Sequence, residues 1–325
     1  MVTLTDFLNS LNNPLIARAF TAAILIGIIC SVIGVFIILK GVIFLGEAIA
    51  HAAFAGASLA ILLGMSNPIL LIMIFGVSTS ILVTYVNEKE IMGDEVVIGI
   101  SFTFFMALAI FFIGLMDRLS TTVSTILLGR ILFITLLNYQ LLLISTIVVI
   151  LSIILLKRNL YTLIFDEEVA KASGINVKAL NYYFFILVAL AINVSLTSIG
   201  AILVFAMLIT PAASAYQWTY NINKMLIISL IFGIASSVGG FVLSFIYNWP
   251  SGSTIIILST LFFLISFLLS PKRTYSSKSS VDFDLKRLPH FHSNQSITSD
   301  QYIDHLRETT EFENNDLIKL GDKNE

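Results

Sequence analysis

The chain has 325 residues, of which 57% are hydrophobic and only 12% are charged, with a formal net charge of −2 at pH 7. Soluble domains carry about a quarter charged residues, so this composition excludes an ordinary soluble domain, and we expect no nucleic-acid partner. Residues 271–325 hold eight of the basic and ten of the acidic side chains. The composition therefore predicts a membrane-embedded body followed by a polar tail. Cys30 is the only cysteine, which excludes an intrachain disulfide.

Residues 1–14 form a polar lead that ends in Asn12-Asn13-Pro14. The first hydrophobic run starts near Leu15 without a basic segment or a cleavage site, so we interpret it as a retained span and not as a signal peptide. A helix needs about 20 apolar residues to cross a hydrocarbon core of about 30 Å. Nine runs approach or exceed this length, at residues 15–39, 43–64, 68–86, 96–115, 138–156, 180–199, 200–218, 225–247 and 252–270.

Residues 15–270 are therefore predicted to form an all-α polytopic membrane bundle of about nine transmembrane helices, within a range of eight to ten. A weaker run at 123–137 contains Arg130 and is better interpreted as a short or partly inserted helix. Basic residues in short loops face the cytoplasm. Nine spans with an external N-terminus place these residues inside, namely Lys40, Lys89, Lys157, Arg158, Lys171, Lys178, Lys224, Lys272 and Arg273.

The stretch from Gly46 to Gly56 contains a carboxylate, Glu47, and an imidazole, His51, inside an apolar run. Residues four apart lie on the same face of a helix, one above the other. His51 is the only histidine before residue 290. Ionisable residues at membrane depth are expensive and mark a functional site by default. The spacing predicts that these two side chains act together.

Imidazole suits Zn and Fe(II), and a carboxylate adds a hard oxygen that also accepts Mn(II). Two ligands make an incomplete site, which suits a pathway because a transported ion must leave as well as bind. A second copy of the chain across a dimer axis would complete the ligand shell. Two other interpretations stay open at this point: an internal Glu–His hydrogen bond that ties spans together, and a proton relay in a secondary transporter.

The longest cytoplasmic loop within the body is predicted at 157–179. Within it, Asp166 to Gly174 is typical of a short helix, because acidic residues favour a helix N-terminus and glycine ends a helix. This helix is either an ordinary solvated connector or the place where a soluble partner transmits force to the membrane. In the later run, Pro211 follows Thr210 and removes a helical hydrogen bond, which predicts a kinked or broken span.

The tail at 271–325 lacks apolar periodicity and is rich in Ser, Asn, Asp and Lys, so we expect it to be disordered and cytoplasmic. Its His290, His292 and His305 have no fixed metal-ligand spacing and indicate metal binding only weakly. Nowhere does the sequence contain a phosphate-binding P-loop or a dinucleotide-binding glycine motif. We therefore do not expect the chain to be an enzyme or to hydrolyse ATP itself.

Four stretches in this order resemble the permease subunit of the metal-ion ABC importers, the ABC-3 family of manganese, zinc and iron transporters. The resemblance covers about residues 14–273. Its four stretches are Phe36–Ala52, Asp94–Ile100, Phe165–Gly174 and Val194–Ala215. In this family an aspartate is usually followed four residues later by a histidine. His51 matches the histidine, whereas Glu47 stands in place of the aspartate, and Ala55 stands where a proline is common.

The resemblance implies a fold similar to a reduced vitamin B12 or siderophore permease, paired with a second permease copy in a prokaryotic plasma membrane and surrounded by lipid. It implies that Glu47 and His51 belong to the ion pathway. A pair of cytoplasmic ABC ATPase subunits would dock on the coupling segment, and an extracytoplasmic metal-binding protein would deliver the ion. The residues expected to make the ATPase contact are Asp166, Glu167, Glu168, Ala170 and Gly174.

The expected function is the import of a divalent transition metal ion, Mn, Zn or Fe, driven by ATP hydrolysis on a separate subunit. The ion is the cargo, and no permanently bound cofactor is expected. Thr210 and Pro211 are expected to shape the pathway. The alternative is a proton-coupled secondary metal carrier that works without an ATPase. The scarcity of intramembrane acids disfavours that alternative, because proton relays use chains of ionisable groups.

Overall fold

The computed structural model describes residues 4–89, 93–116 and 131–270. The chain divides into a unit Met1–Lys272 and a unit Arg273–Glu325, and all described residues belong to the first. The predicted tail and its three histidines lie outside the described residues. The same holds for most of the weak run at 123–137, of which the structure describes a single helical turn, η1 (Ile131–Phe133), and the start of the next helix.

The described residues are helical and contain no strand. Nine of their helices are long and apolar enough to cross a membrane, so the predicted all-α membrane bundle is confirmed. The helices are α1 (Leu4–Ser10), α2 (Pro14–Lys40), α3 (Leu45–Leu62), α4 (Ile69–Glu88), α5 (Asp94–Gly114), α7 (Leu136–Phe165), α8 (Glu167–Ala172), α9 (Val177–Ile199), α10 (Ala201–Trp218), α11 (Ile222–Tyr247) and α12 (Ser251–Leu268).

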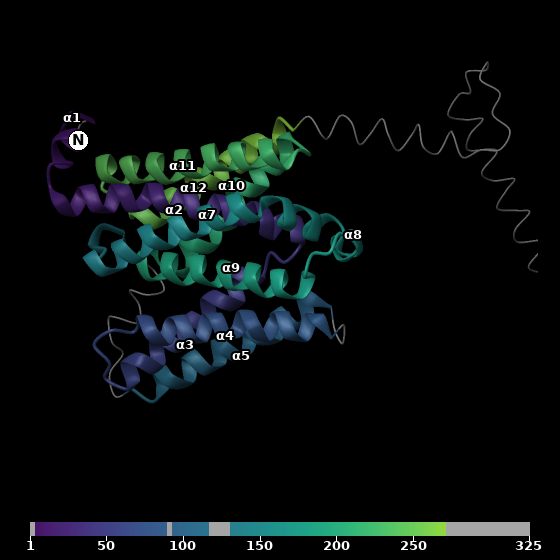
Figure 1. The fold of residues 1–325 in the computed structure, drawn as a ribbon. Coiled ribbons are helices and arrows are strands. Elements are labelled where there is room, and N and C mark those ends of the chain that lie inside the picture. Colours follow the sequence, from purple (N-terminus) through teal and green to yellow (C-terminus); the bar gives the residue numbers. More distant parts are fainter. Residues whose placement is uncertain (1–3, 90–92, 117–130, 271–325) are drawn as a thin grey trace, which may run out of the picture. The chain divides into compact units, whose positions relative to one another are not determined.

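The interior of the bundle is built around α2, α3 and α9, which are mostly buried, whereas α5 and α12 leave most of their side chains exposed. Helix α2 packs against α7, α10 and α11, and α3 packs against α4, α5 and α9 (Figure 1). Exposed Leu, Ile and Phe side chains on the outer helices are expected in a membrane, because lipid tails are as apolar as these side chains. The described part of the chain therefore has its least exposed helices where a pathway would be lined.

The polar lead is helical over α1, and its Phe7 is buried. The Phe7 ring meets Phe20 of α2 and Phe245 of α11 edge to face, with ring centroids 5.7 and 5.3 Å apart. Such aromatic pairs add about 0.5–1.5 kcal/mol each beyond the area they bury. The lead therefore anchors one end of α2 and α11 through a single aromatic side chain.

Helix α7 is longer than the sequence indicates. Residues 157–165 of the predicted loop continue this helix, which ends only at Phe165. Leu160 and Leu163 are buried, and the segment contains neither glycine nor proline to stop a helix. The connection that remains between α7 and α9 is short and consists of α8 with its two flanking turns.

Helix α10 runs without interruption through Pro211, so the predicted break at Thr210–Pro211 is wrong. Pro211 is buried, and its ring nitrogen cannot donate to the carbonyl one turn back. Hydroxyl groups partly compensate in this region, because Thr210 donates to the Ala206 carbonyl and Ser214 donates to the Thr210 carbonyl at 2.7 Å. Side chains of this kind re-satisfy the backbone of proline-containing membrane helices. The sharp change of direction lies instead at Gly200, between α9 and α10, where φ is +88°.

Candidate functional site

Glu47 and His51 lie on α3, in its first and second turns. The preceding helix, α2, ends at Lys40, and Gly41 with φ of +79° turns the chain toward α3. The carboxylate of Glu47 lies in the first turn, where the helix dipole favours a negative charge. The His51 Nε2 and Glu47 Oε1 atoms are 3.0 Å apart. The predicted same-face arrangement is therefore present, although the role of the pair remains a prediction.

The two side chains differ in exposure, with 12% of the His51 side chain and 32% of the Glu47 side chain accessible. The edge of one ring meets the face of the other between His51 and Phe102 of α5, with centroids 4.7 Å apart and planes at 87°. When His51 donates from Nε2 to Glu47, its Nδ1 atom is left buried, without a hydrogen-bond partner among the described residues. The imidazole is thus held by one carboxylate and one aromatic ring.

This geometry is suited to binding one cation at two adjacent positions. Nitrogen and oxygen ligands lie about 2.0–2.2 Å from an ion such as zinc. Two ligand atoms 3.0 Å apart therefore subtend an angle of roughly 90° at the ion. No group of three or more His, Cys, Asp or Glu side chains that could hold a metal occurs in the described parts of the chain. The remaining ligands would have to be water, backbone oxygen or groups from outside this chain.

The hydrogen bond between Glu47 and His51 joins two residues of one helix. It therefore ties no two spans together, which removes the basis of the structural interpretation. The ring nitrogen that faces Glu47 must give up its proton before it can bind a metal, since only a deprotonated imidazole nitrogen is a ligand. A proton that moves to Nδ1 leaves the imidazole neutral and available.

The second predicted site, α8, is a short helix with well-defined ends. Asp166 caps its N-terminus, because its Oδ1 atom accepts hydrogen bonds from the backbone N–H groups of Glu168 at 2.9 Å and Val169 at 3.0 Å. Gly174 follows its C-terminus with φ of +77°, a conformation that L side chains rarely adopt. The predicted start and stop signals are thus both present in the structure.

The five residues predicted for the ATPase contact separate into different roles. Glu167 and Glu168 are exposed, and Glu167 pairs with Lys171 at 3.2 Å on the outer face. Ala170, in contrast, is fully buried, so its side chain packs α8 onto the bundle and cannot face a partner. Since Asp166 and Gly174 set the ends of the helix, only the glutamates remain as predicted contact side chains.

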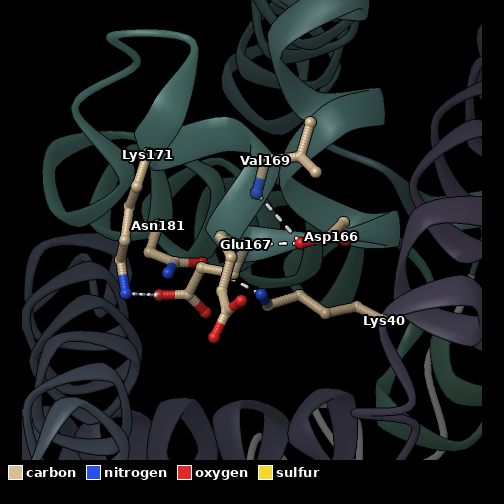
Figure 2. A network of polar contacts seen from close by, with 7 residues as sticks. Lys40, Asp166, Glu167, Val169, Lys171 and Asn181 are labelled. Atoms are coloured by element: carbon tan, nitrogen blue, oxygen red, sulfur yellow. Dashed lines mark hydrogen bonds and ion pairs between the residues drawn. The ribbon is translucent and has the colours of Figure 1, made fainter.

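A polar network that the sequence did not indicate lies beside α8 (Figure 2). The Lys40 Nζ atom donates to Asn181 Oδ1 of α9 at 2.9 Å, and Lys178 of α9 pairs with Glu88 of α4 at 3.0 Å. The same Glu88 oxygen accepts from the Tyr182 hydroxyl at 3.3 Å. These contacts join the ends of α2 and α4 to the first turns of α9, around a cavity of about 360 Å³.

This network gives α8 a physical connection to the Glu47–His51 pair. A displacement of α8 acts first on α9, which begins shortly after Gly174. Helix α9 holds Lys40 through Asn181, and Lys40 ends the helix that leads directly into α3. Sequence reasoning recognised Lys40 only as a marker of orientation, because its partner is 141 residues away along the chain.

Replacing Asp166 with alanine is expected to destabilise α8 locally by about 1 kcal/mol, since this is the typical loss for a helix N-cap. Helix α8 has only six residues, so the loss falls on a large fraction of its stability. We expect faster amide exchange at Glu168 and Val169, measured by hydrogen–deuterium exchange. The control Asp166→Asn keeps a capping oxygen and should exchange like wild type. Equal exchange in Asp166→Ala and wild type would contradict the assigned cap.

Comparisons with known proteins give consistent matches. A family model described as "ABC 3 transport family" matches residues 12–270. The manganese transport system membrane protein MntC of Listeria monocytogenes is 36% identical over 256 residues, which are 79% of this chain and 91% of that protein. The manganese import system permease protein ScaB of Streptococcus parasanguinis is 36% identical over 83% of this chain and 96% of its own length.

A solved structure also matches most of the chain. It is described as PsaBC from Streptococcus pneumoniae in complex with Fab, and the matching chain has a TM-score of 0.74 and 33% sequence identity. The match covers 85% of this chain and 100% of the other. The two matched regions therefore share the fold of the bundle.

Proposed function

This chain belongs to the ABC 3 transport family, and we propose that it is the membrane permease of an ATP-driven importer that carries manganese into the cytoplasm. As a member of that family it is a multi-pass transporter subunit and not an enzyme. The observation that carries the proposal is the Glu47–His51 pair, with its two ligand atoms 3.0 Å apart on a mostly buried helix. Zinc and Fe(II) are the other ions that this pair suits.

Manganese is placed first because of the relatives and the chemistry of the site. Two proteins with 36% identity to this chain are named as manganese transporters or permeases. A carboxylate oxygen is a ligand that manganese accepts readily, and Glu47 supplies one. Glu47 keeps the charge that an aspartate would carry and extends it by one methylene, so its carboxylate reaches Nε2 of His51 within the same helix.

The pair is suited to transient binding. Metal-ligating histidines in resident sites almost always donate their second ring N–H to a carboxylate or carbonyl. The Nδ1 atom of His51 has no such partner among the residues described. A ligand without this support holds its ion less tightly, and conduction requires weak binding. We therefore assign Glu47 and His51 to a site that the ion occupies briefly during transport.

The driving force would come from a pair of cytoplasmic ABC ATPase subunits bound at α8. Its exposed Glu167 and Glu168 would face the ATPase, while buried Ala170 would transmit the displacement to the bundle. An extracytoplasmic metal-binding protein would deliver the ion, and a second copy of the chain would complete the channel. In this arrangement residues 271–325 would form a cytoplasmic tail of a prokaryotic plasma membrane protein. Family membership supports this mechanism over a proton-coupled carrier.

The test is the total cellular content of Mn, Zn, Fe and Co, measured by mass spectrometry in metal-limited medium. A strain that lacks the chain is compared with the same strain carrying the wild-type chain. We expect manganese to fall in the deletion strain and to return with wild type. A fall in zinc or iron alone would overturn manganese as the cargo. Unchanged contents of all four metals, with other importers removed, would contradict the importer itself.

A further inference from the structure

Asn193 lies in the interior of α9 and is 0% exposed. Neither its Oδ1 nor its Nδ2 atom has a hydrogen-bond partner among the described residues. Buried amide groups are almost always hydrogen-bonded, because an unpaired one loses its water without compensation. Polar groups inside a membrane bundle are rare for the same reason and are typical of substrate pathways. An apolar side chain of the same size would serve packing alone better.

The structure accommodates this amide on a glycine. A Cβ atom at Gly76 of α4 would lie 2.2 Å from Asn193 Oδ1 and 2.3 Å from Nδ2. The side chain of Asn193 therefore lies directly against the α4 backbone, in space that any larger residue at position 76 would occupy. One turn further along α4, Ser80 is also fully buried, and its hydroxyl has no partner in the same described set.

Asn193 is also close in level to the Glu47–His51 pair. A Cβ atom at Gly46, the neighbour of Glu47, would lie 3.7 Å from the Cδ1 atom of Ile192, the neighbour of Asn193. Helices α3, α4 and α9 all pack on one another. The turn of α9 that contains Asn193 therefore lies beside the turn of α3 that contains Glu47. His51 contributes the other unpartnered ring atom on α3.

We propose that Asn193 is a third polar group of the ion pathway, whose side-chain carbonyl contacts the divalent cation, directly or through one water, as the ion passes between Glu47–His51 and α9. This inference rests on the proposed function. An amide oxygen is a hard ligand that suits divalent cations. Since it adds no charge, it helps an ion to pass without trapping it.

The described conformation has no open space at this group, because Asn193 is fully buried against Gly76. The ion reaches the amide only when α4 and α9 move apart. The Lys178–Glu88 ion pair joins the same two helices at their ends near α8. A displacement of α8 therefore acts on the two helices that cover Asn193, which connects the proposed third group to the proposed ATPase contact.

The test uses the complete transporter, with its ATPase and binding protein, in cells that lack the wild-type chain. Asn193→Leu keeps the side-chain volume and removes both polar atoms. We expect the initial rate of radioactive manganese uptake to fall about tenfold or more, whereas the melting temperature of the detergent-purified variant stays equal or rises. The matched control is Ser259→Ala, which removes a buried, unpartnered hydroxyl on α12, away from α3, α4 and α9.

Asn193→Asp provides a second variant with a different signature. A negative charge beside the pathway should hold the ion longer, so both KM and the maximal rate of manganese uptake should fall. Wild-type uptake by Asn193→Leu would overturn the inference, and so would a loss of uptake that accompanies a lower melting temperature, because that result indicates a packing role. Failure of the wild-type chain itself to import manganese, zinc or iron would overturn the proposed function instead, and this inference with it.

Discussion

The double variant Glu47→Ala, His51→Ala is expected to lose manganese uptake while it still reaches the membrane. Loss of a group that only supports a metal ligand already lowers metal affinity or activity by about 10–100-fold, so removal of both proposed ligands should have at least that effect. Folding should tolerate the change, since the bond between the two side chains lies within α3 and joins no other helix. The measurement is the initial rate of radioactive manganese uptake, normalised to the amount of the chain in the membrane.

Single variants sharpen this prediction. Because both atoms bind one ion, Glu47→Ala and His51→Ala should each reduce uptake almost as far as the double variant, as groups that act as a unit are not additive. Glu47→Asp is the conservative control, since it keeps the carboxylate and introduces the acid that related permeases usually carry. We expect it to retain most uptake with an altered KM. Normal uptake by the double variant at an equal membrane level would rule out the ligand assignment.

Most of the fold was predictable because membrane helices obey a length rule. Apolar runs of about 20 residues identify spans without any knowledge of their contacts, and the described helices follow these runs closely. The Glu47–His51 contact was predictable for an equally local reason, since residues four apart meet on any helix. The caps of α8 were likewise visible in Asp166 and Gly174, whose side-chain chemistry acts within a few residues.

The errors and omissions arose where distant residues decide the outcome. The continuation of α7 depends on the burial of Leu160 and Leu163 against other helices, which a hydropathy pattern does not contain. Pro211 did not break α10, because neighbouring hydroxyls and helices support its backbone. Asn193 was not recognised in the sequence, since a lone asparagine in an apolar run has no distinguishing pattern. Only its contact with Gly76, more than 100 residues earlier in the chain, reveals its environment.

The close approach of α2 and α10 predicts the largest effect on stability. A Cβ atom at Gly34 would lie 1.8 Å from the carbonyl oxygen of Leu208 and 3.3 Å from the Cβ atom of Ala212. The nearest obstacle is backbone within a continuous helix, so it cannot move aside as a flexible side chain would. Gly34→Val would have to separate α2 from α10. Overpacking a well-packed core typically costs about 1–3 kcal/mol and occasionally more, and this contact lies at the severe end.

The expected result is that Gly34→Val lowers the melting temperature of the detergent-purified chain and its level in the membrane, and that Gly34→Ala does the same to a smaller extent. The matched control is Gly99→Ala on α5, where a Cβ atom would meet nothing within 4 Å. That change should be neutral or should stabilise the helix by up to about 1 kcal/mol, because alanine has the higher helix propensity. If Gly34→Ala and Gly99→Ala melt at the same temperature, α2 and α10 are not packed as described. The connection from α8 through α9 and Lys40 to Glu47 would then lose its support, since it requires α2 to be held in this position.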